Sequence, residues 1–375
     1  MRRNRSRQWL KIACLGALLV GASVLALEGL VRLAAFLSAG VRQSVAAPST
    51  RGGMRGVVQQ DAEIGYRLVP GYTGKGENPI HVAINSLGFR DREYDLTGAD
   101  ANRRFVLAAG DSFSFGAVVE LDQTYLSYLE TSFQKEDPSW TIVKTGVPGY
   151  SLLQSVATVR RHVDRFRPEF VIIQTIPETE GRNFLPQQVV GGMIVVPKPG
   201  WHYQVVEDQI FDSPFPPGIF ASVDLLAYRI SNAYRLGRRV VVARMHGDLS
   251  GAELVRSRSM GLEALAGLNR DLRQRGIPLL VVLNNWAQET AAGWDAVKGL
   301  NEEYAHFCRQ NEVPVLDTLS PFKAETERSG YQGRSAGDRH WSVTGHRFAS
   351  ELIATQVRGL GWASPRHIKP DERSH

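Results

Sequence analysis

The chain has 375 residues, of which 43% are hydrophobic and 22% are charged, a composition typical of globular proteins that excludes global disorder. The net charge is +6, and basic residues beyond the N-terminus are scattered rather than gathered in a stripe, so nucleic acid is not expected as a partner. The two cysteines, Cys14 and Cys308, lack the spacing of a zinc site, and we expect neither a metal nor an intrachain disulfide.

An arginine-rich N-terminus precedes the first apolar run. Arg2, Arg3, Arg5, Arg7 and Lys11 stand before residues 12–27, and extending this run to residue 9 or 30 gives the roughly 20 residues of a membrane span. Because positive charge stays cytoplasmic, we expect a single-pass inner-membrane protein whose C-terminal domain is periplasmic or extracytoplasmic. A cleaved signal peptide ending at Val24-Leu25-Ala26 is the alternative. The apolar character beyond that site favours an uncleaved anchor.

The domain plan follows from changes in composition along the chain. Residues 1–41 form the basic N-terminus and anchor, 42–60 a linker, and 61–100 an accessory segment with short strand-like pieces. Strands and helices alternate through residues 101–362, apart from an insertion at 185–250 that is rich in Pro, Gly and aromatic residues. Residues 363–375 read as a flexible tail.

Apolar periodicity predicts the elements of residues 101–362. We expect strands at 105–109, 140–143, 170–173, 278–283 and 313–317. We expect helices at 123–135, 152–166, 252–275, 296–310 and 343–360, the last capped by Ser342. Such alternation predicts an α/β fold with a mostly parallel sheet and helices on both of its faces.

Ser112 stands where the first of these strands ends, in Gly110-Asp111-Ser112-Phe113-Ser114-Phe115-Gly116. Ligands of open α/β sheets bind at the carboxyl edge, and a helix that begins there directs backbone N–H groups at developing negative charge. A serine hydroxyl needs a base, so the interpretation requires a histidine. A helix-capping serine is the alternative.

Asp338-Arg339-His340-Trp341, just before the last helix, supplies the candidate base. His340 would take the proton from Ser112, and Asp338 would orient the imidazole. His346 is a weaker candidate because it falls inside that helix, and His246 lies in the insertion.

Gly149 lies in the loop Gly146-Val-Pro-Gly149-Tyr-Ser after the second strand. A glycine there lets the backbone approach a reacting carbonyl and donate its N–H. An ordinary Pro-Gly turn is the alternative.

Together these motifs resemble the SGNH (GDSL-type) hydrolase superfamily, especially its membrane-anchored bacterial members, many of which carry an Asn-Ser-x-Gly-Phe-Arg segment, here residues 85–90. The resemblance covers residues 80–184 and 250–360 and implies a flavodoxin-like three-layer α/β/α sandwich. It makes Ser112 nucleophile and oxyanion donor, Gly149 the second donor, and Asp338 with His340 the rest of a triad. It implies no cofactor.

The chain departs from the family pattern after the third strand, where the family has an oxyanion-binding Asn usually followed by Asp. Thr179-Glu180 occupies that register, and Asn183 follows one helical turn later. We therefore expect Thr179, or Asn183, to serve as the third donor.

The resemblance implies a serine-dependent carboxylic ester hydrolase that acts on acyl esters, with O-acetylated envelope or extracellular polysaccharide as the expected acyl carrier. Aromatic residues in the insertion, among them Trp201 and Phe215, would suit stacking on sugars. The alternatives are a polysaccharide O-acetyltransferase and a catalytically impaired module that binds glycan or protein. A nucleotide-binding Rossmann protein is disfavoured because no Gly-x-Gly-x-x-Gly follows the first strand. The oligomeric state stays open.

Overall fold

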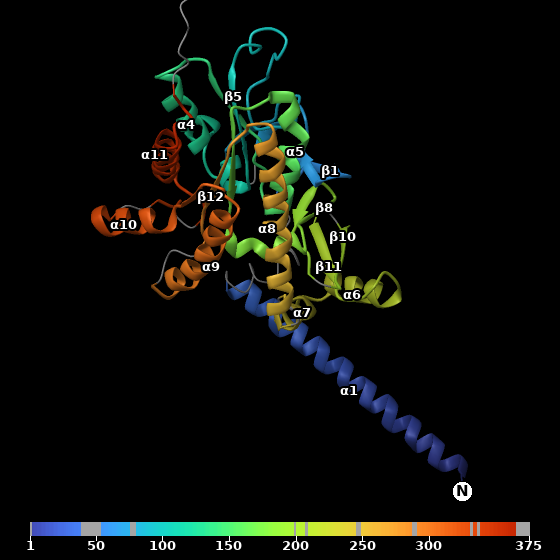
Figure 1. Cartoon of the computed structure of the whole chain (residues 1–375). Coiled ribbons are helices and arrows are strands. Elements are labelled where there is room, and N and C mark those ends of the chain that lie inside the picture. The colour runs from blue at the N-terminus through green and yellow to red at the C-terminus, as the bar shows by residue number, and fades with distance from the viewer. Residues whose placement is uncertain are drawn as a thin grey trace, which may run out of the picture. The chain divides into compact units, whose positions relative to one another are not determined.

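The computed structural model describes residues 2–38, 54–75, 80–198, 200–206, 209–244, 249–286, 291–330, 333–335 and 338–364. The chain divides into two units, one made of Met1–Gly52 with Lys198–Asp248 and the other of Gly53–Pro197 with Leu249–His375 (Figure 1). The larger unit holds the predicted sheet.

Five parallel strands form this sheet. Its order is β13 (Val315–Asp317), β12 (Leu279–Leu283), β7 (Phe170–Thr175), β5 (Arg104–Ala109), β6 (Trp140–Lys144). Numbered along the chain this is the order 2-1-3-4-5 read from β6, the flavodoxin-like arrangement whose switch point lies at β5. The predicted fold class is confirmed, and every predicted strand is present.

Alternate side chains along the strands of this sheet pack into two separate hydrophobic cores, one on each face. In β5, Phe105 and Leu107 pack toward one core and Val106 and Ala108 toward the other. Every residue of β5 is buried, because helices cover both faces and leave no solvated side.

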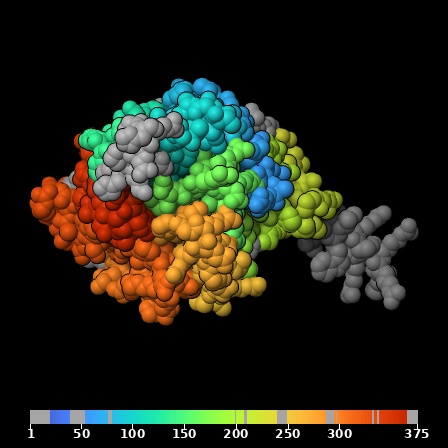
Figure 2. All heavy atoms as spheres, turned by 45° about the horizontal axis from the view of Figure 1, so that its top comes forward, coloured from blue at the N-terminus to red at the C-terminus, as the bar shows by residue number. Residues whose placement is uncertain are grey.

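Two layers of helices, one on each face of the sheet, complete these two cores. The first holds α5 (Leu152–Phe166), α8 (Gly251–Gln274) and α9 (Ala291–Gln310), and the second α4 (Tyr125–Gln134), α10 (Leu319–Ser329) and α11 (Val343–Gly359). Figure 2 shows α8 (gold) beside α9 (orange) on the surface. Side-chain caps fix where helices begin: the hydroxyl of Ser342 accepts from the Gly345 N–H at the start of α11, as predicted.

Short hairpins from residues 58–83 and from the start of the insertion form a third core. They are β1 (Val58–Asp61) with β2 (Gly65–Leu68), β3 (Thr73–Lys75) with β4 (His81–Ala83), and β8 (Gln188–Val190) with β9 (Met193–Val195). Val57 and Val58, at the end of the expected linker, are buried in this core, because they pair and pack with β2. The remaining linker residues up to 53 and the tail from 365 lie outside the described residues.

The smaller unit contains α1 (Arg2–Leu37), the hairpin β10 (His202–Val206) and β11 (Gln209–Ser213), α6 (Ile219–Ile230) and α7 (Asn232–Arg244). The helix α1 is long and apolar enough to cross a membrane, and its window Val20–Leu37 has a mean hydropathy of 1.8 and is 6% buried. A candidate membrane span or signal sequence near the N-terminus is therefore present.

Candidate active site

Ser112 begins the short helix α3 (Ser112–Phe115) directly beyond the end of β5. Asp111 caps this helix, and its carboxylate accepts from the Phe113 N–H at 3.0 Å. Gly110 has no room for a side chain, since a Cβ there would lie 2.3 Å from Ser114 Oγ. The tight strand-to-helix turn therefore presents the Ser112 hydroxyl at the carboxyl edge of the sheet.

His340 and Asp338 meet Ser112 across a sequence separation of 228 residues. Ser112 Oγ lies 2.7 Å from His340 Nε2, and His340 Nδ1 lies 2.6 Å from Asp338 Oδ1. The same carboxylate oxygen accepts from the His340 backbone N–H at 2.8 Å. Burial by itself would raise the pKa of Asp338, but the hydrogen bonds and charge of His340 outweigh it and lower that pKa. The aspartate therefore stays ionised and fixes the ring through Nδ1.

Aromatic rings surround the imidazole. The His340 ring lies 5.0 Å from that of Phe113 and 5.2 Å from that of Trp286. Trp341, next in sequence, is fully buried and stacks on Phe322 at 5.4 Å. Its role is therefore packing, whereas the rings of Phe113 and Trp286 contact the imidazole of His340.

His346 is in a different position, inside α11. Its ring is 1% exposed, and its Nδ1 accepts from the Tyr125 N–H at 3.1 Å. Burial lowers the pKa of His346 to about 3. It is held neutral as an acceptor in the core. His246 lies outside the described residues.

The backbone N–H groups of Ser112 and Gly149 are the predicted oxyanion donors. In the described part of the chain neither the Ser112 nor the Gly149 N–H donates to a protein acceptor. Gly149 has a φ of 82°, and a Cβ there would meet Gln187 at 1.7 Å and Tyr66 Oη at 2.8 Å. Conformation and space both require glycine. Tyr66 Oη donates to Pro148 O at 2.7 Å and so holds this loop.

The two candidates for the third donor already have local partners. Thr179, in the 3-10 helix η2 (Pro177–Asn183), donates its hydroxyl to Ile176 O at 2.9 Å. Asn183 is 5% exposed, and its Oδ1 accepts from the Leu153 N–H at 3.1 Å. Its amide nitrogen also faces Gly261, where an added Cβ would lie 2.5 Å away. Asn183 thus joins η2 to α5 and α8, and its role at the oxyanion stays a prediction.

Arg182, between these two residues on η2, was missed by the sequence reasoning. Its Nη1 is buried and lacks a hydrogen-bond partner among the described residues. Burial raises the pKa of Asp111, while the nearby charges of Arg182 and His340 act to lower it. Arg182 also interacts electrostatically with Tyr66, beside Gly149. The Arg182 guanidinium thus interacts electrostatically with Asp111, which precedes Ser112, and with Tyr66, which holds the Gly149 loop. No local sequence spacing indicates it.

Arg90, the last residue of the Asn-Ser-x-Gly-Phe-Arg segment, clamps the far end of α3. Its buried guanidinium donates to Phe115 O at 3.0 Å and Gly116 O at 2.7 Å, and also to the carbonyls of His81 and Val119. Burial lowers the pKa of Arg90 to about 10. The segment therefore fixes the helix that carries Ser112.

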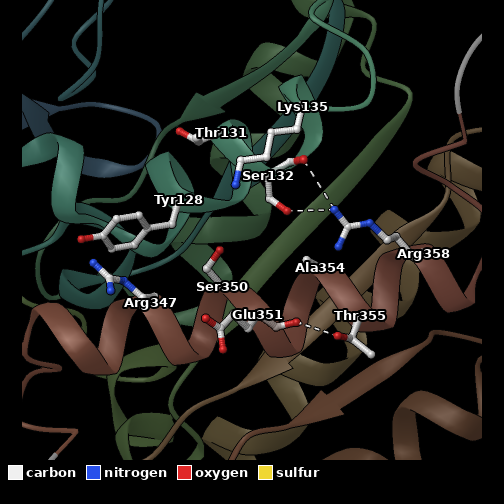
Figure 3. Close-up of a pocket in the computed structure, with 10 residues that line it drawn as sticks. All are labelled: Tyr128, Thr131, Ser132, Lys135, Arg347, Ser350, Glu351, Ala354, Thr355 and Arg358. Carbon is white, nitrogen blue, oxygen red and sulfur yellow. Dashed lines mark hydrogen bonds between the residues drawn. The ribbon is translucent and has the colours of Figure 1, made fainter.

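A groove of about 420 Å³ lies elsewhere, between α4 and α11, and is lined by Tyr128, Thr131, Ser132, Lys135, Arg347, Ser350, Glu351, Ala354, Thr355 and Arg358 (Figure 3). Arg358 crosses it to bond Ser132 Oγ at 2.8 Å. No triad residue lines it, so we assign the chemistry to the sheet edge rather than to this groove.

No protein-family model matches the chain, and no curated protein matches it in sequence. Similar solved structures include a lipolytic protein of the G-D-S-L family from Desulfitobacterium hafniense, with 13% identity, a TM-score of 0.39, and coverage of 68% of this chain and 99% of that one. The acetyl xylan esterase AlAXEase has 12% identity, a TM-score of 0.40 and coverage of 68% and 99%. A mutant of the acetylxylan esterase Axe2 from Geobacillus stearothermophilus has 16% identity, a TM-score of 0.39 and coverage of 70% and 97%. By its strand order and by the motifs that meet at the sheet edge, the chain has the fold of the SGNH (GDSL-type) hydrolases.

Proposed function

We propose that the protein is a serine-dependent carboxylic ester hydrolase with Ser112, His340 and Asp338 as its catalytic residues. The continuous chain of hydrogen bonds from Asp338 through both nitrogens of His340 to Ser112 Oγ carries the proposal. A hydroxyl that faces an imidazole oriented by a carboxylate is the arrangement that nucleophilic acyl transfer requires.

The reaction then has two balanced halves. Ser112 Oγ attacks the ester carbonyl while His340 Nε2 takes its proton, and the tetrahedral intermediate expels the alcohol as His340 returns that proton to it. Water then attacks the acyl-serine with His340 again as base, and collapse releases the carboxylic acid and restores the Ser112 hydroxyl. Asp338 stabilises the imidazolium in both halves.

The negative charge of the intermediate needs donors. The N–H groups of Ser112 and Gly149 supply two, because both are unused by protein acceptors in the described part of the chain. We propose the Arg182 guanidinium as the source of positive charge in place of the family asparagine, since its buried Nη1 lacks an acceptor among the described residues. Such preorganised charge is worth most in a dry site.

For the acyl carrier we propose O-acetylated polysaccharide outside the cytoplasm. The support is the resemblance to anchored bacterial members together with the basic residues at the start of α1, between Arg2 and Lys11, which would keep that end cytoplasmic. Incubation with an acetylated glycan, with and without an unacetylated acceptor, separates hydrolysis, which yields free acetate, from acetyl transfer.

The competing proposal is an inactive binding module. It is favoured by the hydroxyl of Thr179, which bonds Ile176 O where the family has a free amide donor. The aligned triad favours the enzyme, because a structural role alone does not require Ser112, His340 and Asp338 to be joined by consecutive hydrogen bonds.

The first prediction separates the two. Ser112→Ala should lower the hydrolysis of short acyl esters by on the order of 10⁴-fold or more, because the nucleophile is lost. A fluorophosphonate probe should label the wild type at Ser112, as read by peptide mass spectrometry. Ser114→Ala is the matched control, since the hydroxyl of Ser114 bonds Tyr125 rather than His340. An unlabelled wild-type protein with a native circular dichroism spectrum would favour the binding module.

A further inference from the structure

Helix α6 of the smaller unit presents an apolar face to solvent. Five of its large apolar side chains are 57–74% exposed: Ile219, Phe220, Val223, Leu226 and Ile230. At 3.6 residues per turn these positions fall within about 120° of arc. An apolar stripe of this width marks a surface that binds something apolar.

A buried charge beside this stripe fixes α6 to its own unit. Asp224 is 2% exposed and accepts from Arg238 Nε at 2.8 Å, from Tyr234 Oη at 2.8 Å and from Ser213 Oγ at 3.1 Å. Arg238 also pairs with Asp212, which is fully buried. Rotating α6 so that its apolar stripe is buried would break the hydrogen bonds of Asp224. These bonds therefore keep the stripe exposed.

The end of that stripe is joined to α1. Glu28 of α1 accepts from Ser231 Oγ at 2.8 Å and from the N–H groups of Asn232 at 3.1 Å and Ala233 at 2.9 Å, and it thereby caps α7. Arg32 Nη2 lies 3.5 Å from the carbonyl oxygen of Ile230, the last residue of the stripe. The α6–α7 junction is thus bound to one stretch of α1.

This stretch lies where a membrane span would end. The window Val20–Leu37 of α1 contains the charges of Glu28 and Arg32. Counting about 20 residues from the last basic residue of the N-terminus, Lys11, instead brings the outer end of the span near Leu30. Glu28 and Arg32 flank that point. The apolar stripe of α6 therefore ends, at Ile230, at the boundary between hydrocarbon and water.

We propose that α6 is an interfacial membrane helix whose apolar face enters the outer leaflet of the bilayer that α1 crosses. Amphipathic helices with apolar faces of this kind bury them at the headgroup–acyl boundary. The part of the insertion that belongs to the smaller unit then serves membrane attachment, with α1 and α6 as two linked contacts. The proposal is independent of the chemistry at Ser112.

The test is a depth measurement on the full chain in vesicles. A background of Cys14→Ser and Cys308→Ala carries one added cysteine, labelled with the fluorophore NBD, at Val223→Cys or at Val255→Cys. The two positions are matched, because Val223 on α6 is 58% exposed and Val255 on α8 is 57% exposed. Phosphatidylethanolamine–phosphatidylglycerol vesicles with doxyl-labelled acyl chains quench probes in hydrocarbon, and iodide quenches probes in water.

We expect the Val223→Cys probe to be blue-shifted, quenched by doxyl lipid and protected from iodide, while the Val255→Cys probe is quenched by iodide alone. Equal iodide quenching at both positions would overturn the proposal. Protection of the Val223→Cys probe from both quenchers would also overturn it and would indicate that a second copy or another protein covers α6. Circular dichroism of both labelled chains verifies that each is folded.

Discussion

At the scale of single residues, the geometry of the site depends on the contacts that orient the His340 ring and the Ser112 hydroxyl. The imidazole of His340 is fixed by Asp338 at Nδ1, and its Nε2 reaches Ser112 at 2.7 Å. The hydroxyl is fixed by the turn that Asp111 caps. These restraints explain why the Ser112 hydroxyl and the His340 ring are aligned.

Arg182 gives the second prediction, also at this scale. Arg182→Gln should lower kcat by about 10²-fold with little change in KM, because charge near the intermediate is lost while ground-state contacts remain. Steady-state kinetics on a short acyl ester measure the split. Arg160→Gln is the control, since Arg160 is half-exposed and pairs with Asp271 on α8. A variant of Arg182 with unchanged kcat would rule out its role and leave the two backbone N–H groups as the donors.

At the scale of elements, α3 is a helix of four residues that cannot hold itself in place. The Arg90 guanidinium holds it, because it donates to the carbonyls of Phe115 and Gly116 at the end of α3 and to those of His81 and Val119 beyond it. The turn that precedes it is local, since Asn85 Oδ1 accepts from the N–H groups of Leu87 and Phe89. The Asn85–Arg90 segment is thus a clamp for the nucleophile helix.

The third prediction concerns this clamp. Arg90→Lys should lower the free energy of unfolding by about 2 kcal/mol or more, because an ammonium cannot satisfy carbonyls on two sides that the planar guanidinium bridges. We also expect kcat to fall as α3 loosens. Chemical denaturation and ester kinetics measure both. Arg92→Lys serves as comparison, because Arg92 pairs with Asp100 rather than with α3. Equal losses in the two variants would contradict a special role for Arg90.

At the scale of the whole molecule, stability should depend on pH through His346. Its pKa is lowered by burial to about 3 from an ordinary 6.5, so the unfolded chain binds more protons between these values. Stability from this group is therefore complete above about pH 6.5 and decreases as the pH falls toward 3, by up to about 1.4 kcal/mol per pH unit.

The fourth prediction follows from this loss of stability at lower pH. Thermal melts of the wild type should shift to lower temperature between pH 7 and pH 5, and His346→Gln, which keeps a neutral acceptor, should shift less. If both chains lose the same stability over this interval, His346 is not the group responsible. Activity need not follow the same curve, because His346 contacts Tyr125 rather than Ser112.

The sequence by itself determined the sheet and the candidate triad. Continuous apolar runs flanked by amphipathic segments specify buried parallel strands, and the strand-end positions of Ser112 and Gly149 follow from those runs. Helices α6 and α7 were not predicted, because the Pro- and Gly-rich stretch around them obscured the 3.6-residue period of Ile219–Ile230. The recurrence of apolar residues every three or four positions in Ile219–Ile230 was the sequence signal from which α6 could have been predicted.

Only the tertiary structure decided which distant groups meet. Periodicity acts over a few residues, whereas the 2.7 Å approach of Ser112 and His340 spans 228 residues and depends on the packing of α11 against α4. For the same reason sequence spacing gave no indication that Thr179 turns to Ile176 O, that Arg182 lies near Asp111, or that Glu28 caps α7. Side-chain direction is set by the neighbours a folded chain supplies, and these neighbours are remote in sequence.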